Sequence, residues 1–220
     1  MDTLQIDPSF KKTLKVGVVG CGRNSKHHLR VYAHTKNVEL AAVCDIQEAL
    51  AEKVAKSYGA KQFFTRADQL LKLDLDLVDI VTPTPTHAAH TIQALESGHD
   101  VLVEKPMSLS SSDCPEMIAA SRTRGRCLYV NHNKRFYNCV LETKNIIQQE
   151  GASVSRMRFS HFFIYNKIRP NWILTEETGG VLWEAMVHHV YMLEHFLGRI
   201  QTVYAVAKKP GVRYMIRSRF

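Results

Sequence analysis

Residues 14–25 read LKVGVVGCGRNS, and this stretch decides the fold of the first half of the chain. Residues 14–20 form a short apolar run that ends in glycine, which predicts a buried parallel strand. We expect a helix to follow over about 24–34. Gly20 permits the tight turn between the two, and Gly22 lets backbone approach a diphosphate at the free N–H groups of the helix start. Ser25 replaces the third glycine of the usual fingerprint.

An acidic residue follows this turn at the spacing of a ribose-binding site. Residues 38–44 read as a second strand, and Asp45 stands at its carboxyl end, 20 residues after Ser25. A carboxylate there accepts hydrogen bonds from the ribose 2′- and 3′-hydroxyls and repels a 2′-phosphate. Ile46 follows without an adjacent cation, so the sequence predicts NAD rather than NADP, although a structural helix-capping Asp stays an alternative. The cofactor-binding residues predicted here are Gly20, Gly22, Arg23, Asn24 and Asp45.

Apolar runs alternate with helical patterns as far as residue 130. Further strands are predicted at 62–64, 77–81, 100–104 and 127–130, with helices over 47–58, 87–97 and about 111–124. This alternation predicts an α/β fold, a Rossmann doubly wound parallel sheet. The pattern then changes: we expect a helix over 137–149, a strand over 154–165, a helix over 180–197 and a strand from 202. The predicted division is a tail (1–12), an NAD-binding domain (13–130) and a second, partial domain (131–220).

Two segments at the carboxyl edge of the predicted sheet favour a site. Residues 82–87 read TPTPTH, and their prolines make a stiff, extended loop that can lie along a cofactor or simply be a loop without a ligand. Glu104, Lys105 and Pro106 end the fifth strand. A lysine at that edge can polarise an alcohol or carbonyl and pass on a proton, while the alternative is a solvated side chain. Pro106 permits a cis bond that could aim the lysine.

Composition narrows the function classes. No apolar run is long enough to span a membrane, the first residues lack a secretory pattern, and five widely spaced cysteines without a CxxC pair fit a reducing cytoplasm. The net charge is +8, and residues 131–220 hold 13 Lys or Arg against 6 Asp or Glu. That excess is either a solvated surface or a nucleic-acid patch; without a recognised nucleic-acid motif we expect no nucleic-acid partner.

These segments together resemble the Gfo/Idh/MocA family (glucose–fructose oxidoreductase, inositol 2-dehydrogenase and relatives) from residue 14 to about 206. The motifs that carry the resemblance are Gly20-Cys21-Gly22, Asp45, Thr82-Pro83 with His87, and residues 98–106, 131–136 and 179–188. The resemblance implies a Rossmann domain followed by an incomplete α/β domain with a mostly antiparallel sheet. It also implies an NAD(P)-dependent dehydrogenase that oxidises a hydroxyl of a sugar or cyclitol, or reduces the matching ketone.

The same resemblance implies roles for single residues. Lys105 matches the family's active-site lysine, and His188 matches the histidine that takes the alcohol proton. Glu184 stands where the family usually has Asp, which orients substrate or histidine; four residues before His188, it shares a face with it on a regular helix. Arg135 matches a position near the substrate. Thr82, Pro83, His87 and Glu104 are expected to bind the cofactor.

Three departures leave alternatives open: Ser25, Glu184 and the end of the chain at Phe220. A shortened sheet would expose strand edges, so we expect instability, aggregation or pairing with another chain, and a homo-oligomer once the sheet is completed. The alternative functions are a non-catalytic nucleotide-binding or scaffolding protein and, from the basic tail alone, a nucleic-acid binder. A metal site of Glu184, His188 and His195 is the remaining alternative, and we expect no metal.

Overall fold

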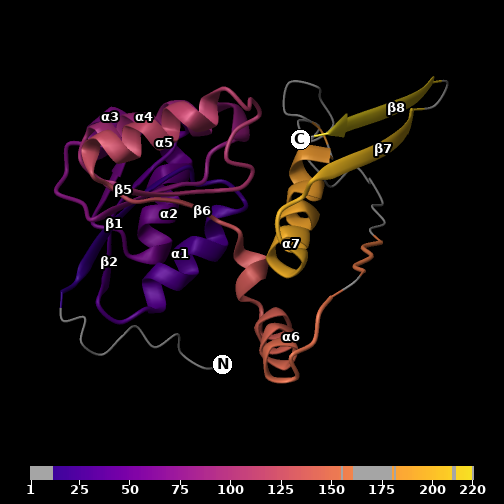
Figure 1. Ribbon diagram of the computed structural model, residues 1–220. Helices are drawn as coiled ribbons and strands as arrows, with labels where there is room; N and C mark the ends of the chain where they lie inside the picture. The colour runs from indigo at the N-terminus through magenta and orange to yellow at the C-terminus, as the bar shows by residue number, and fades with distance from the viewer. Residues whose placement is uncertain (1–11, 155, 161–179, 181, 210–211, 220) are drawn as a thin grey trace. The chain divides into compact units, whose positions relative to one another are not determined.

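The computed structural model describes residues 12–154, 156–160, 180, 182–209 and 212–219, coloured in Figure 1. The chain divides into two compact units. The first comprises Met1–Asn131 with Pro170–Glu184, and the second comprises His132–Arg169 with Ala185–Phe220. In the described part of the chain, no helix is both long and apolar enough to cross a membrane.

The first unit contains a six-stranded parallel sheet in the order β3-β2-β1-β4-β5-β6. This is the Rossmann order, in which β1 and β4 are paired at the centre and the later strands of each half are added on either side. The prediction of a doubly wound parallel sheet is therefore confirmed. Its elements are β1 (Leu14–Val19), α1 (Ser25–His34), β2 (Val38–Cys44), α2 (Glu48–Tyr58), β3 (Gln62–Phe64), α3 (Ala67–Leu70), β4 (Leu77–Ile80), η1 (Thr84–Thr86), α4 (His87–Glu96), β5 (Asp100–Val103), α5 (Asp113–Arg124) and β6 (Leu128–Val130).

The core of this unit lies on both faces of the sheet. One apolar cluster joins Val16 and Val18 of β1 to Leu29 of α1 and to residues of α2. The other joins Ile80 of β4 and residues of β5 to α4 and α5, which lie on the other side of the sheet from α1 and α2 (Figure 1). Because both faces are covered, the central strands are mostly apolar, although β4 carries the buried Asp79.

Gly20 makes a close backbone approach at the carboxyl end of β1. Its φ is +101°, and a Cβ there would lie 2.6 Å from the Val81 carbonyl oxygen and 2.9 Å from the Thr82 amide nitrogen. Residues with a side chain rarely adopt that backbone conformation. The two atoms that the Cβ would meet belong to the backbone, so they cannot move aside as a flexible side chain could. Gly22 differs, because a Cβ there would meet nothing within 4 Å. Gly20 is thus required by the fold, whereas Gly22 keeps a surface open.

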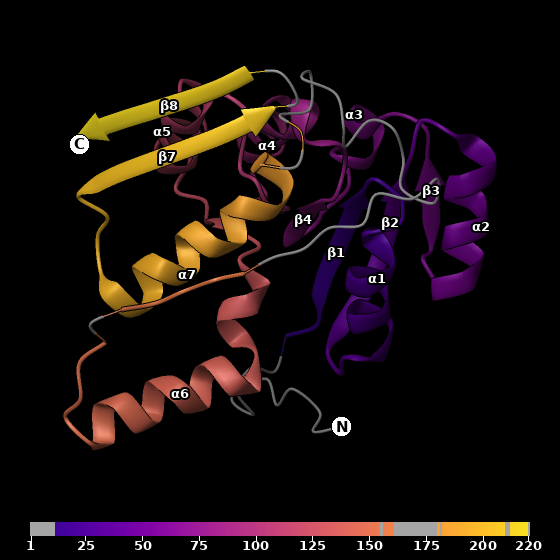
Figure 2. The same ribbon diagram turned by 90° about the vertical axis from the view of Figure 1, so that its right-hand side faces the viewer.

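The second unit is described in parts. They are η2 (Asn133–Phe136), α6 (Asn138–Gln149), α7 (Val187–Leu197) and the antiparallel hairpin of β7 (Thr202–Lys209) and β8 (Val212–Arg219), all labelled or visible in Figure 2. A π-helical turn at Leu182–Met186 begins in the first unit and leads directly into α7. The His132 ring stacks on Tyr191 of α7 with 4.3 Å between ring centroids. The expected helices over 137–149 and 180–197 are confirmed in these parts.

Two expectations for this unit differ from the structure. Residues 154 and 156–160 form no strand, and 161–165 lie outside the described residues. An alternating pattern of apolar side chains predicts a strand, but a strand forms only where another strand supplies hydrogen bonds. None of the described strands pairs with this segment. Residues 212–219, for which no element was predicted, form β8 against β7. Pro210-Gly211 is a turn signal that could have predicted this hairpin.

A pair of alanine substitutions tests the close approach at Gly20. Gly20→Ala is expected to lower the free energy of unfolding by roughly 2 kcal/mol or more, because the added Cβ strains the turn. Gly22→Ala is the matched control and should unfold at nearly the wild-type denaturant concentration. Equal midpoints for the two variants in urea unfolding would contradict this interpretation.

Candidate functional site

A cavity of about 520 Å³ lies at the carboxyl ends of β1, β2, β4 and β5. This is the edge of a doubly wound sheet where ligands bind, beside the point at which the strand order reverses. The cavity brings together all of the predicted cofactor-binding residues and two of the three predicted catalytic ones. These are Gly20, Gly22, Arg23, Asn24, Asp45, Thr82, Pro83, His87, Glu104, Lys105 and Glu184. Sequence reasoning missed other residues of the lining, among them Thr65, Ala67 and His90.

Two backbone amides hold the Asp45 carboxylate. Its Oδ2 accepts from the Cys21 amide at 2.9 Å, and its Oδ1 accepts from the Gln47 amide at 3.0 Å. Burial and the Asp45 charge raise the pKa of the Cys21 thiol to about 12, so the thiol stays neutral beside the carboxylate. A carboxylate oxygen has two lone pairs, so both oxygens keep acceptor capacity for ligand hydroxyls.

The start of α1 is suited to a diphosphate. The Ser25 hydroxyl donates to the Gly22 carbonyl at 2.7 Å, which closes the glycine turn with the small side chain that replaces the third glycine. The Asn24 side chain makes no capping hydrogen bond to the helix. The first amides of a helix lack intrahelical partners, and with no side-chain cap they can bind an anion. The open space beside Gly22 fits this approach.

His87 connects two loops of the cavity. Its ring is buried at the start of α4, with Nδ1 2.9 Å from the Pro106 carbonyl oxygen and Nε2 2.9 Å from the Thr82 carbonyl oxygen. Burial lowers the pKa of His87, against the opposing effect of these two carbonyls. The loop after β4 and the turn after β5 are therefore held together through one side chain. The Lys105-Pro106 bond, within the turn after β5, is cis.

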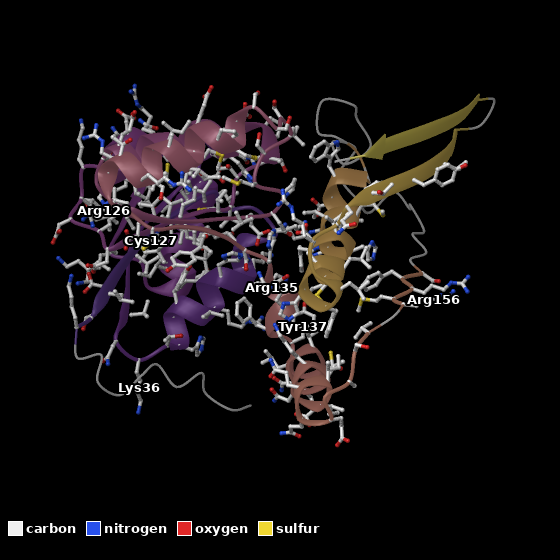
Figure 3. The ribbon with its side chains drawn as sticks, viewed as in Figure 1. Lys36, Arg126, Cys127, Arg135, Tyr137 and Arg156 are labelled. Atoms are coloured by element: carbon white, nitrogen blue, oxygen red, sulfur yellow. The ribbon has the colours of Figure 1, made fainter. Side chains whose placement is uncertain are left out.

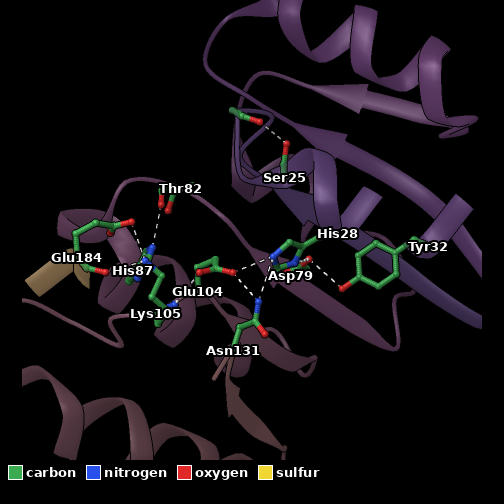
Figure 4. A network of polar contacts seen from close by, with 11 residues as sticks. Ser25, His28, Tyr32, Asp79, Thr82, His87, Glu104, Lys105, Asn131 and Glu184 are labelled. Atoms are coloured by element: carbon green, nitrogen blue, oxygen red, sulfur yellow. Dashed lines mark hydrogen bonds and ion pairs between the residues drawn. The ribbon is translucent and has the colours of Figure 1, made fainter. Parts of the chain in front are cut away.

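Lys105 is buried and ion-paired. Its Nζ lies 2.8 Å from Glu184 Oε1 and 3.2 Å from the Glu184 carbonyl oxygen (Figure 4). The side chains of Lys105 and Glu184 are 8% and 27% exposed. In the described residues, two of the three ammonium donors therefore go to one residue, and the third can serve an oxygen in the cavity. Glu184 lies in a π-helical turn that runs directly into α7, and its expected shared face with His188 stays a prediction.

Glu104 lines the cavity, but its carboxylate also enters a buried polar network. Oε2 accepts from the Lys105 amide at 3.1 Å, while Oε1 contacts His28 at 2.9 Å and accepts from Asn131 at 2.6 Å (Figure 4). Sequence reasoning missed His28 and Asn131. The sequence offered one weak signal for His28. It lies four residues before Tyr32, so both side chains project from the same side of α1, next to the buried Leu29.

His188 and Arg135 belong to the second unit. His188 Nδ1 lies 2.7 Å from the Tyr191 hydroxyl, one turn further along α7. Arg135 is exposed in η2, where its side chain is labelled in Figure 3. Their expected catalytic and substrate roles stay predictions. Among the described residues, no three His, Cys, Asp or Glu side chains gather as a metal site requires, which does not support the alternative of Glu184, His188 and His195.

A family model described as "Oxidoreductase family, NAD-binding Rossmann fold" matches residues 14–132, more than half of the chain. The chain belongs to the Gfo/Idh/MocA oxidoreductase family. The resemblance inferred from the motifs is thereby confirmed. The model ends at residue 132, close to the boundary of the first unit at Asn131.

The chain is similar to proteins that are named as dehydrogenases. The chain is 30% identical over 183 residues to 1-carboxy-3-chloro-3,4-dihydroxycyclo hexa-1,5-diene dehydrogenase of Comamonas testosteroni, covering 80% of the chain and 46% of that protein. It is 28% identical over 189 residues to inositol 2-dehydrogenase of Salmonella typhimurium, covering 84% and 55%. The chain thus spans about half the length of these curated relatives.

One solved structure that is similar to this chain contains both a nicotinamide cofactor and a cyclitol. It is scyllo-inositol dehydrogenase from Lactobacillus casei with bound NAD(H) and scyllo-inositol, similar with a TM-score of 0.60 and 26% identity over 64% of this chain and 42% of that one.

Replacing His87 tests its role in joining the two loops. His87→Ala is expected to lower the free energy of unfolding by about 2–4 kcal/mol, because the neutral ring donates one hydrogen bond to a carbonyl of these loops and its buried packing between them is also lost. His90→Ala removes a half-buried ring from the same cavity without touching those carbonyls, and should cost much less. Similar urea midpoints for both variants would show that His87 does not hold the loops.

Proposed function

We propose that this chain is an oxidoreductase that moves a hydride between NAD and a hydroxyl or ketone of a sugar or cyclitol. The observation that carries the proposal is the Asp45 carboxylate, held by two backbone amides in the same cavity as the buried Lys105. The names of the relatives support the substrate class, because they act on inositols and a dihydroxylated ring. Homo-oligomer formation and a cytoplasmic location stay predictions from the sequence.

The preference for NAD over NADP is argued from charge. Asp45 is fixed by its amide donors, so it cannot swing away from a ribose 2′-phosphate. Two negative groups at hydrogen-bond distance repel, whereas ribose hydroxyls donate to the same oxygens. Arg23 also lines this cavity and lies next to the glycine turn, where its charge is suited to a diphosphate.

The chain's own residues supply the proton chemistry. When bound, a nicotinamide exchanges a hydride with the substrate carbon. The Lys105 ammonium, held at two donors by Glu184, presents a donor to the substrate oxygen and stabilises the negative charge that develops on it. His188 is proposed to accept the hydroxyl proton, as the resemblance implies, and Arg135 to bind substrate.

Nucleotide titrations of Asp45→Asn test the cofactor preference. The wild-type chain is expected to bind NADH more tightly than NADPH, as measured by calorimetry. Asp45→Asn should weaken NADH binding about 10-fold, because it removes charge-assisted hydrogen bonds, and should reduce the discrimination against NADPH. Glu48→Gln removes a carboxylate three residues away that does not line the cavity, and should change neither value. Heat from neither nucleotide with the folded wild-type chain would refute the proposal.

Turnover with Lys105→Met separates catalysis from nucleotide binding. A panel of inositols and sugars is offered with NAD, and NADH formation is followed at its absorbance maximum. Lys105→Met is expected to lower kcat about 10²- to 10⁴-fold while NADH affinity stays near wild type. Lys56→Met, an exposed lysine paired with Glu52, is the control. NADH binding by the wild type without turnover of any substrate would instead support a non-catalytic nucleotide-binding protein.

A further inference from the structure

Two buried carboxylates in the first unit flank one histidine. Asp79 in β4 is fully buried, and Glu104 follows the neighbouring strand β5 with a side chain 11% exposed. His28 reaches between them from α1: its Nδ1 lies 2.7 Å from Asp79 Oδ2 and its Nε2 lies 2.9 Å from Glu104 Oε1 (Figure 4). An unpaired buried carboxylate is costly, and a cation between these two compensates the charge of both.

The geometry identifies His28 as that cation. Ionised carboxylates only accept hydrogen bonds, so each ring nitrogen of His28 must carry a hydrogen. Burial alone lowers the pKa of His28, but hydrogen bonds to Asp79 and Glu104 and their charges outweigh it and raise the pKa to about 10. The Asn131 amide nitrogen also lies 3.2 Å from Nε2, but a protonated Nε2 has no lone pair, so that amide donates to Glu104.

Further donors join the network at both ends, although Asp79 Oδ1 is buried without a hydrogen-bond partner among the described residues. The Tyr32 hydroxyl, also from α1, donates to Asp79 Oδ2 at 2.9 Å. Asn131, which follows β6, donates to Glu104 Oε1 at 2.6 Å. The pKa of the Glu104 carboxyl is lowered, because hydrogen bonds from His28 and Asn131 and the nearby positive charges outweigh its burial. The network therefore links α1 with residues in or directly after three neighbouring strands.

The hydrogen-bonded Glu104 carboxylate also restrains the backbone of Lys105, the candidate catalytic lysine. Its second oxygen, Oε2, accepts from the Lys105 backbone amide at 3.1 Å. One carboxylate thus bonds the His28 imidazolium with one oxygen and the Lys105 backbone with the other. The Lys105 side chain is held at its far end by Glu184, so His28 acts on the near end of the same residue.

We propose that His28 is a positioning residue: a buried imidazolium that fixes the Glu104 carboxylate and, through it, the backbone of Lys105. Its catalytic consequence rests on the proposed function, in which Lys105 serves the substrate oxygen. Its structural content, a doubly protonated His28 that restrains Lys105, does not. A positioning error of about 1 Å at a reacting group can cost about 10²-fold in rate, which sets the size of the expected effect.

The first experiment measures the protonation of His28 directly by nitrogen-15 NMR of the wild-type chain, with His28→Gln used to assign the signal. Both ring nitrogens are expected to be protonated at pH 8, where an ordinary histidine is neutral. Glu104→Gln, which keeps size and an acceptor but removes one charge, should lower the pKa of His28. A wild-type His28 that is neutral at pH 8 overturns the proposal.

Proton linkage gives an independent reading of the same charge. His28 has a pKa of about 10 in the folded chain against 6.5 as the ordinary value, so the folded state holds one more proton between these limits. Unfolding then releases a proton, and the free energy of unfolding attributable to His28 falls as pH rises from about 6.5 to 10. The groups that face the ring are Asp79, Glu104, Tyr32 and Asn131. His28→Gln should remove this slope, and a slope that persists unchanged contradicts the assignment.

The last experiment reads out Lys105 itself. His28→Gln is compared with His27→Gln, an exposed neighbour on the same helix that serves as the matched control. His28→Gln is expected to lower kcat about 10²-fold with KM and NADH affinity near wild type, and to speed acylation of Lys105, followed by mass spectrometry, about 10-fold or more. His27→Gln should change neither.

The acylation measurement distinguishes the positioning role of His28 from the proposed dehydrogenase function, because it does not require turnover. Faster acylation in a chain without turnover supports the positioning role and refutes the proposed function. A His28→Gln chain that is folded, with wild-type kcat and wild-type acylation of Lys105, overturns the positioning role whatever the function.

Discussion

The site depends on one close backbone approach, in which the turn after β1 passes within van der Waals contact of the chain leaving β4. Gly20 makes this possible because it has no Cβ and adopts a positive φ beside Val81 and Thr82. The approach lies where the strand order of the sheet reverses, so two loops that diverge to opposite sides begin side by side. Any larger residue would separate the glycine turn from the Thr82 loop, and the cavity is lined by both.

Near the close approach at Gly20, two carboxylates are held by hydrogen bonds from the protein, but with different kinds of donor. Asp45 is held by neutral backbone amides, which orient the carboxylate and leave its charge uncompensated toward the cavity. Glu104 is held by a charged partner, His28, and by side-chain and backbone donors, which compensate its charge within the protein. The first arrangement suits a group that meets a ligand, and the second suits a group that holds a neighbour in place.

Lys105 lies where these restraints meet. Its backbone amide is bonded to Glu104, the carbonyl of the following Pro106 contacts His87, and its ammonium is paired with Glu184. A lysine side chain has four flexible torsions, and such restraints lower the entropy cost of presenting its ammonium in one place. Glu184, which stands where the resemblance implies an Asp, contacts this lysine through its carboxylate.

The sequence by itself determined the order of strands and helices in the first unit, the glycine turn and the position of Asp45, because periodicity and short-range spacing are local properties. It also placed Lys105 and His87 at the correct edge of the sheet, since the carboxyl ends of parallel strands share one edge. Only the tertiary structure decided which side chains pair there. His28, Asp79, Glu104 and Asn131 are separated by up to 103 residues, and a charge that must be matched in a buried site leaves no periodic trace in the chain. The strand expected over 154–165 failed in its described part for the same reason, because a strand depends on a distant partner that no local pattern can supply.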